Sequence, residues 1–235
     1  MRIALLHGFA GDPDAWDDVI AEWPRGDDLR AIALPGHGAP IADSWDANLA
    51  LVREAIGNVD LVIGYSLGAR AALGLVASGH VARAILVSVN PGIADADRPT
   101  RRASDAAWAR LLRERGIAAF VTAWEAQPLF ATQARVVPDR IAARRARRLA
   151  LDPGALATSL ETMGLAEMPD YRAAVTADRT ALVAGADDEK YVAIARTLPA
   201  PLTIIARAGH DPTLEQPAAL AQVLTRTARA ARRES

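Results

Sequence analysis

The strongest chemical pattern in the sequence surrounds Ser66, in the pentapeptide Gly64-Tyr65-Ser66-Leu67-Gly68. A run of β-forming residues precedes the pentapeptide and a stretch of small, helix-forming residues follows it, which is the context that a G-x-S-x-G turn needs. Gly64 and Gly68 lack the side chains that would collide in so tight a turn. The pattern therefore predicts a Ser66 hydroxyl raised above the edge of a sheet.

A serine hydroxyl becomes reactive when a histidine accepts its proton and a carboxylate orients that histidine. Of the four histidines, His210 follows the last predicted strand, which brings it to the same sheet edge as Ser66. In this architecture the acid precedes the histidine along the chain. Asp187 and Asp188 both satisfy that order, and one of them can instead cap the next helix. We favour Asp188 as the acid.

Two further features complete the predicted site. The backbone amides of Phe9, in the loop after the first predicted strand, and of Leu67, at the start of a helix, are expected to form an oxyanion hole. Arg70 lies one helical turn beyond Ser66 and can point the same way. A guanidinium suits bidentate binding of a carboxylate, so Arg70 favours an anionic substrate. The alternative for Arg70 is a surface salt bridge.

The elements that position these residues alternate between strand and helix. Short apolar runs predict strands over residues 2–6, 29–34, 59–63, 83–89, 180–184 and 202–206. Helical patterns lie between most of them, and a helix over 214–230 closes the chain. This alternation is typical of an α/β protein with a doubly wound, mostly parallel sheet.

Residues 100–171 interrupt the alternation with helical patterns alone. We expect one helix that begins at Ser104, one over 117–124, one over 138–149 and one that begins at Asp152. A helical block between two strands of one sheet is most simply an inserted cap. The predicted division is a core of residues 1–99 and 172–235 and a helical cap of residues 100–171. Most cap arginines are expected on solvated helix faces.

The composition argues against several kinds of partner and binding site. The chain has 235 residues, of which 51% are hydrophobic and 23% charged, and its net charge is −1. Such a composition is typical of a globular protein, and the net charge gives no electrostatic reason to expect nucleic acid or a membrane surface as a partner. The absence of cysteine excludes disulfides and thiolate metal ligands. No segment has the length of a secretory signal or a membrane span, so we expect a cytoplasmic protein without membrane insertion.

These motifs resemble the α/β-hydrolase fold and, within it, the 2-succinyl-6-hydroxy-2,4-cyclohexadiene-1-carboxylate synthase family of menaquinone biosynthesis. Residues 6–9, residues 34–38 and the Ser66 pentapeptide are shared with many hydrolases. Four features are similar to the synthases in particular: Arg70, Asn90-Pro91-Gly92, Trp124 with Gln127-Pro128-Leu129-Phe130, and Asp188-Glu189-Lys190-Tyr191.

The resemblance implies a lyase that eliminates pyruvate from 2-succinyl-5-enolpyruvyl-6-hydroxy-3-cyclohexene-1-carboxylate, with no metal and no cofactor. Ser66, Asp188 and His210 would be its catalytic residues. The residues implied to bind substrate are Tyr65, Arg70, Arg101 or its neighbour Arg102, Trp124, and Arg148 within the arginine-rich run 144–148.

Two alternatives from other classes remain open. A carboxylesterase or thioesterase would use the same serine to form an acyl intermediate on a small, anionic substrate. A binding protein would keep the fold and lose catalysis, but the intact Ser66, Asp188 and His210 argue against that interpretation.

Overall fold

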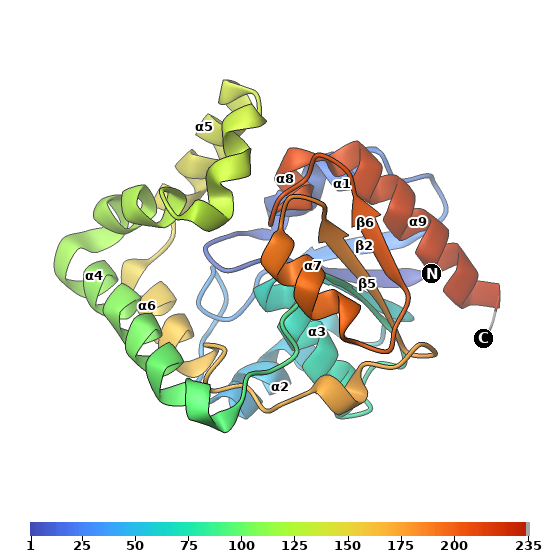
Figure 1. The fold of residues 1–235 in the computed structure, drawn as a ribbon, viewed down its shortest axis with the longest axis horizontal. Helices are drawn as coiled ribbons and strands as arrows, with labels where there is room; N and C mark the ends of the chain where they lie inside the picture. The colour runs from blue at the N-terminus through green and yellow to red at the C-terminus, as the bar shows by residue number, and fades with distance from the viewer. Residues whose placement is uncertain (234–235) are drawn as a thin grey trace.

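One six-stranded sheet organises the computed structural model, which describes residues 1–233 (Figure 1). The strand order is β2-β1-β3-β4-β5-β6, and every neighbouring pair is parallel. The strands are β1 (Arg2–Leu6), β2 (Asp28–Ile32), β3 (Leu61–Tyr65), β4 (Ala84–Val87), β5 (Thr180–Gly185) and β6 (Leu202–Ile205). The predicted doubly wound α/β class is confirmed.

Helices cover both faces of the sheet because alternate strand residues point to opposite sides. In β1, Ala4 and Leu6 join one buried cluster, and Ile3 and Leu5 join the other. The first cluster includes residues of α2 (Trp45–Ile56), α3 (Leu67–Ala77) and α7 (Glu189–Arg196). The second includes residues of η1 (Pro13–Trp16), α1 (Asp17–Ala21) and α9 (Pro217–Arg233).

The sheet grows in opposite directions from β1, with β2 on one side and β3 on the other. The loops after β1 and β3 therefore diverge and leave a crevice at the carboxyl ends of the strands, where α/β proteins bind ligands. Ser66 follows β3 and Phe9 follows β1, so both predicted site segments meet this crevice.

Helices fill the chain between β4 and β5. After η2 (Asp95–Asp97) come α4 (Arg98–Glu125), η3 (Pro128–Arg135), α5 (Pro138–Leu149) and α6 (Pro153–Thr162), and the shorter η4 (Arg172–Ala174) precedes β5. Helices α4 to α6 lie together at one end of the molecule (Figure 1). Residues of α4 and α6 share a third buried cluster, which also contains Ala10 of the loop after β1.

Two boundary predictions are wrong. No helix begins at Ser104, because α4 already begins at Arg98. The predicted separation from a second helix over 117–124 is confirmed, because α4 is kinked at Gly116, whose dihedrals are non-helical (φ 74°). The closing helix is divided into α8 (Pro212–Glu215) and α9. The division falls at Gln216 and Pro217, where proline has no N–H to continue the hydrogen-bond ladder.

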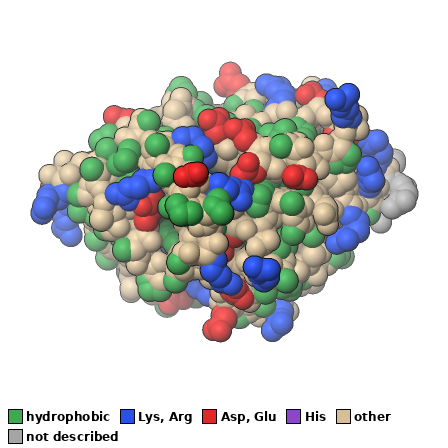
Figure 2. Space-filling model, turned by 90° about the horizontal axis from the view of Figure 1, so that it is seen from above, with side chains coloured by type: hydrophobic (Ala, Val, Ile, Leu, Met, Phe, Trp, Pro, Cys, Tyr) green, Lys and Arg blue, Asp and Glu red, His purple; other side chains and the backbone are tan. Residues whose placement is uncertain are grey.

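Two structural features concern binding to membranes or to charged partners: the length and polarity of the helices, and the distribution of charge on the surface. In the described residues 1–233, no helix combines the length and the apolar character needed to cross a bilayer. On the face drawn in Figure 2, basic and acidic side chains are interspersed and do not gather by sign.

The turn at Ser66 generates a stability prediction. A Cβ on Gly68 would overlap the Leu6 carbonyl and approach the His7 carbonyl oxygen to 2.6 Å, and neither backbone group can move cheaply. We expect Gly68→Ala to lower the free energy of unfolding by about 3 kcal/mol or more, measured by urea denaturation. Gly154→Ala, whose Cβ would meet only the Asp152 carboxylate at 3.3 Å, should change it by less than about 1 kcal/mol. Equal effects would contradict the steric argument.

Candidate active site

Ser66 occupies a strained turn between β3 and α3. Its φ is 51° and its ψ is −105°, a conformation that few non-glycine residues adopt. The Ser66 amide donates to the Val87 carbonyl at 2.9 Å, and the Gly68 amide donates to the His7 carbonyl at 3.0 Å. These bonds to β4 and to the loop after β1 hold the turn, so the hydroxyl is presented at the crevice.

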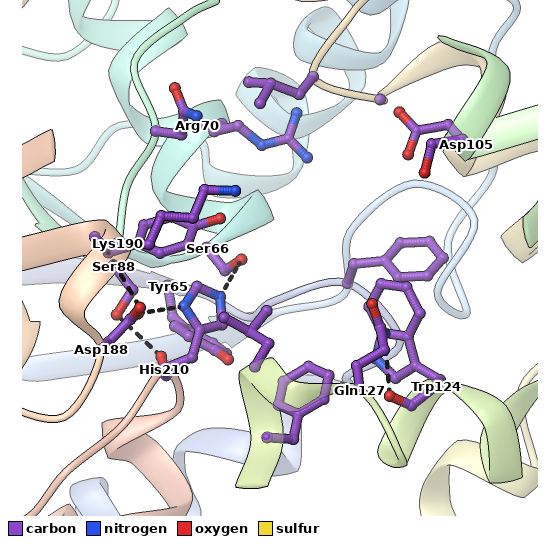
Figure 3. Close-up of a pocket in the computed structure, with 18 of the residues that line it drawn as sticks. Tyr65, Ser66, Arg70, Ser88, Asp105, Trp124, Gln127, Asp188, Lys190 and His210 are labelled. Atoms are coloured by element: carbon purple, nitrogen blue, oxygen red, sulfur yellow. Dashed lines mark hydrogen bonds and ion pairs between the residues drawn. The ribbon is translucent and has the colours of Figure 1, made fainter. Parts of the chain in front are cut away.

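His210 links this hydroxyl to a carboxylate (Figure 3). Its Nε2 lies 3.2 Å from Ser66 Oγ, and its Nδ1 lies 2.7 Å from Asp188 Oδ2. A carboxylate only accepts hydrogen bonds, so Nδ1 carries the proton and Nε2 is free to accept the proton of Ser66. The arrangement can therefore activate the serine as a base or as a nucleophile.

The structure brings Asp188, and not Asp187, to His210. Asp188 is buried, and its other carboxylate oxygen caps α7 by accepting from the Tyr191 amide at 3.4 Å. Asp188 thus both orients His210 and caps α7, two roles that sequence reasoning divides between Asp187 and Asp188. Asp187 is exposed and forms an ion pair with Arg135 at 2.6 Å.

The loop that carries His210 is fixed through its backbone. The Glu215 carboxylate accepts from the Gly209 amide at 2.7 Å and from the Asp211 amide at 3.2 Å, while Ser88 Oγ donates to the His210 carbonyl at 2.9 Å. Burial raises the pKa of Glu215, and these amide hydrogen bonds oppose that shift. The imidazole is therefore held in place before any substrate binds.

Two buried histidines shape the predicted oxyanion loop. His7 Nε2 accepts from the Leu34 amide and His37 Nε2 accepts from the Ala10 amide, each at 3.1 Å. Each Nδ1 lies within 2.9 Å of a backbone carbonyl, to which it donates. Burial, together with the repulsion from His37, lowers the pKa of His7 to about 3, and burial lowers the pKa of His37 to about 4. Both rings are neutral at pH 7, and they tie the Phe9 loop to residues 34–37.

Ser66 and His210 open into a cavity of about 640 Å³, which is the size of a small-molecule site. Its walls come from the loops of the sheet edge and from α4, η3 and α6. The predicted residues that line it are Phe9, Tyr65, Ser66, Arg70, Arg101, Trp124, Asp188 and His210. Leu67 begins α3, so its amide lies in the first turn, where no acceptor exists within the helix.

Arg70 is the cation nearest in sequence to Ser66, and its guanidinium lies in this cavity (Figure 3). It donates to the Met163 carbonyl at 2.8 Å and lies 5.7 Å from the centre of the Trp45 ring. No carboxylate within residues 1–233 forms an ion pair with it, so the alternative of a surface salt bridge is wrong. Burial, with a smaller contribution from Arg101, lowers its pKa to about 10, and an anionic ligand would stabilise this cation.

The two candidate arginines at the start of α4 differ in position. Arg101 lines the cavity and donates through Nε to the buried Asp105 at 2.8 Å. Arg102 is on the outside, where it forms an exposed ion pair with Glu167 at 2.6 Å. Only Arg101 can meet a ligand of this cavity.

Arg148 does not line the cavity in this structure. It is buried, it donates to Glu125 at 3.0 Å, and it lies 5.9 Å from the centre of the Phe130 ring. Phe130 lines the cavity, and its ring centre lies 5.9 Å from that of Trp124, which lines the cavity too. Arg148 thus contacts Phe130, a residue of the cavity wall, without lining the cavity itself.

Sequence reasoning did not assign Asp105 or Lys190 to the site, although both line the cavity. Asp105 was detectable as an acid four residues after Arg101, a spacing that places both on one helix face. Lys190 lies two residues after Asp188, on the first turn of α7. The cavity therefore contains Asp105 paired with Arg101, together with the cations Arg70 and Lys190, and three further acids, Asp187, Asp188 and Glu189, line it beside Lys190.

Comparison with known proteins agrees with this geometry. The model of the alpha/beta hydrolase family matches residues 3–223. The 2-succinyl-6-hydroxy-2,4-cyclohexadiene-1-carboxylate synthase of Enterobacter sp. (strain 638) is 36% identical and covers 97% of this chain and 91% of the relative. The enzyme of the same name from Klebsiella pneumoniae subsp. pneumoniae is 34% identical, covering 94% and 93%. The chain belongs to this synthase branch of the alpha/beta hydrolase family.

Solved structures give the same result. MenH from S. aureus superposes with a TM-score of 0.91 at 27% identity, covering 99% of this chain and 94% of that protein. A thermophilic esterase from Thermogutta terrifontis, with a TM-score of 0.78 at 22% identity over 98% and 90% of the two chains, shares the fold. The family resemblance that the sequence motifs carry is confirmed.

The two neighbouring aspartates provide a matched test of the site. Asp188→Asn should slow the covalent modification of Ser66 by a fluorophosphonate about 10²–10⁴-fold, because an amide favours the wrong tautomer of His210. Asp187→Asn removes only an exposed ion pair and should change that rate less than about three-fold. The rates are measured by mass spectrometry of the intact protein. A larger effect at Asp187 would reverse the assignment of the acid.

The buried histidines generate a pH prediction. His37 has a pKa of about 4 when folded, against about 6.5 when unfolded, so the unfolded chain binds more protons between these values. Its contribution to stability is complete above pH 6.5 and is lost as the pH falls toward 4. Wild type should lose about 1 kcal/mol more per pH unit between pH 6 and 5 than His37→Gln, measured by urea denaturation. Parallel slopes for the two proteins would contradict a neutral buried His37.

Proposed function

We propose that this protein is a lyase that eliminates pyruvate from 2-succinyl-5-enolpyruvyl-6-hydroxy-3-cyclohexene-1-carboxylate to give 2-succinyl-6-hydroxy-2,4-cyclohexadiene-1-carboxylate, without a metal or an organic cofactor. The observation that carries this proposal is Arg70, a partly desolvated cation without a carboxylate partner in the same cavity as Ser66. A neutral ester needs no such cation, whereas a substrate with several carboxylates does. The named relatives over nearly the whole chain support the same reaction.

The proposed reaction begins with proton transfer from Ser66 to Nε2 of His210, which Asp188 orients. The resulting alkoxide removes the proton alpha to the succinyl ketone, and the amides of Phe9 and Leu67 stabilise the developing enolate oxygen. The electron pair moves through the ring and breaks the bond to the enolpyruvyl oxygen. The leaving group gains a proton and tautomerises to pyruvate, so Ser66 forms no covalent intermediate.

The roles of the other lining residues follow from their charge and position. We assign Arg70 and Arg101 to the substrate carboxylates, and Tyr65 and Trp124 to the walls around the ring. Burial raises the pKa of the Tyr65 phenol, so it is a neutral hydrogen-bond donor at pH 7. We assign Arg148 to the support of this wall, through its contact with Phe130 and its ion pair with Glu125.

We also propose that residues 100–171 act as a cap over a core of residues 1–99 and 172–235, of which 234 and 235 lie outside the described residues. The cavity supports this division, because α4, η3 and α6 contribute one wall and the sheet edge contributes the other. The substrate class and the biosynthetic reaction favour a cytoplasmic enzyme that acts on a small, anionic molecule and needs no nucleic acid.

The experiment incubates the enzyme with the enolpyruvyl precursor in oxygen-18 water, measures pyruvate with lactate dehydrogenase, and examines Ser66 by mass spectrometry. We expect pyruvate release with no acylated Ser66 and no solvent oxygen in the cyclohexadiene product. Inactivity on the precursor, together with rapid acylation of Ser66 by simple esters, would instead establish the esterase alternative.

Arg70 gives a quantitative prediction for the same assay. Arg70→Ala should reduce kcat/KM by the equivalent of about 2–5 kcal/mol, because a desolvated carboxylate loses its partner. Arg70→Lys should recover only part of this, because lysine lacks the planar fork. Arg113→Ala, which breaks an exposed ion pair with Glu161 on the cap, is the control and should stay within about three-fold of wild type. A similarly small effect at Arg70 would exclude it from carboxylate binding.

A further inference from the structure

Helix α5 is attached to the rest of the molecule in an unusual way. Its only buried residues are Arg144 and Arg148, and none of its residues belongs to a buried hydrophobic cluster. Its last residue, Leu149, remains 38% exposed. Apolar packing usually holds an amphipathic helix in place, so other interactions must hold α5.

Arginines provide those interactions. Arg140, Arg144 and Arg147 are spaced i, i+4 and i+7, which places them on one helix face. They form ion pairs with three acids outside the helical segment: Asp12 pairs with Arg147, Asp18 with Arg140, and Asp211 with Arg144. The expectation that the cap arginines lie mostly on solvated faces is therefore wrong for this face of α5.

Only one of the three ion pairs is fully buried. The side chains of Arg144 and Asp211 are 6% and 1% exposed, with Nη1 3.0 Å from Oδ2, whereas Arg140 and Asp18 are 32% and 59% exposed. Arg144 Nη2 also donates to Thr213 Oγ1 at 3.3 Å. A buried ion pair depends strongly on both partners, because removal of one leaves an uncompensated charge, while an exposed pair contributes little.

Asp211 connects this pair to the reacting groups. It directly follows His210, and its Oδ1 accepts from the Leu214 amide at 3.3 Å at the start of α8. The Asp211 amide is held by Glu215. A change in the charge balance at Asp211 must therefore disturb the backbone that carries the His210 imidazole.

We propose that Arg144 is a positioning residue, which holds the His210 loop in its reactive geometry through Asp211 and so couples helix α5 to the Ser66–His210 pair. The inference rests on the proposed roles of Ser66 and His210 but not on the identity of the substrate. Arg144 does not line the cavity, and its buried partner Asp211 belongs to the loop, so its contact with the site is made through the loop.

The test compares Arg144→Met and Asp211→Asn with the matched control Arg140→Met, which removes a partly exposed arginine from the same helix face. Asparagine keeps the acceptor oxygen that caps α8 and removes the charge. The first readout is the rate of Ser66 modification by a fluorophosphonate, which requires no natural substrate. The second is hydrogen exchange of the amides in 207–215, followed by mass spectrometry of peptides. The third is kcat and KM for pyruvate release.

We expect Arg144→Met and Asp211→Asn to slow Ser66 modification at least ten-fold and to accelerate exchange in 207–215, with kcat reduced ten-fold and KM changed less than two-fold. Arg144→Lys, which keeps the charge, should recover part of the labelling rate, and Arg140→Met should remain within two-fold of wild type. If Arg144→Met does not fold, Asp211→Asn and Arg144→Lys decide the question.

Labelling within two-fold of wild type in folded Arg144→Met or Asp211→Asn would overturn the proposal, and so would an equal loss in Arg140→Met. The proposed reaction is judged separately. A wild-type protein that releases no pyruvate but shows the Arg144 effect on labelling would refute the lyase and retain the positioning role.

Discussion

Backbone strain at the carboxyl edge of the sheet is the constraint on which the site depends. The four non-glycine residues with positive φ in the described chain are Ala10, Ser66, Ser88 and Arg207, and they follow β1, β3, β4 and β6 respectively. Each such conformation costs about 1–3 kcal/mol and persists only where the surroundings enforce it. Here the enforcing structure is the parallel sheet, whose buried strands fix the points from which these loops depart. The packing of the sheet thus maintains the strained backbone conformations of the loops at its carboxyl edge.

His210 illustrates how the edge loops act together. Its side chain is oriented by Asp188 from the loop after β5, and its carbonyl is held by Ser88 after β4. Its neighbouring amides are held by Glu215, which precedes α9. Several independent segments therefore determine the position of one imidazole. Such preorganisation lowers the cost of reaching the reactive arrangement, because the imidazole already lies within hydrogen-bond distance of Ser66.

The core and the helical segment are stabilised by different forces. The sheet and its covering helices form two large apolar clusters, and α4 and α6 share a third that reaches the loop after β1. Helix α5 lacks apolar burial and is held by arginine–carboxylate pairs. The more exposed of these pairs, such as Arg140 with Asp18, weaken with salt, whereas close-packed apolar side chains and the buried pair of Arg144 and Asp211 are much less sensitive to it. Helix α5 is therefore attached by ion pairs and not by apolar packing, and one of these pairs joins it to the loop that carries His210.

Local patterns in the sequence determined the strand–helix alternation, the turn at Ser66 and the histidine that serves it, because hydrophobic periodicity and turn residues act over a few positions. They favoured Asp188 over Asp187 as the acid but could not show the contact itself, since both aspartates follow the same strand and the partner histidine lies 22 residues further along. Helical spacing likewise shows which arginines of α5 share a face, but the acids opposite that face come from three separate segments. Only the tertiary structure brings such groups together, because the folding of the sheet, and not the local sequence, sets the distances between its loops.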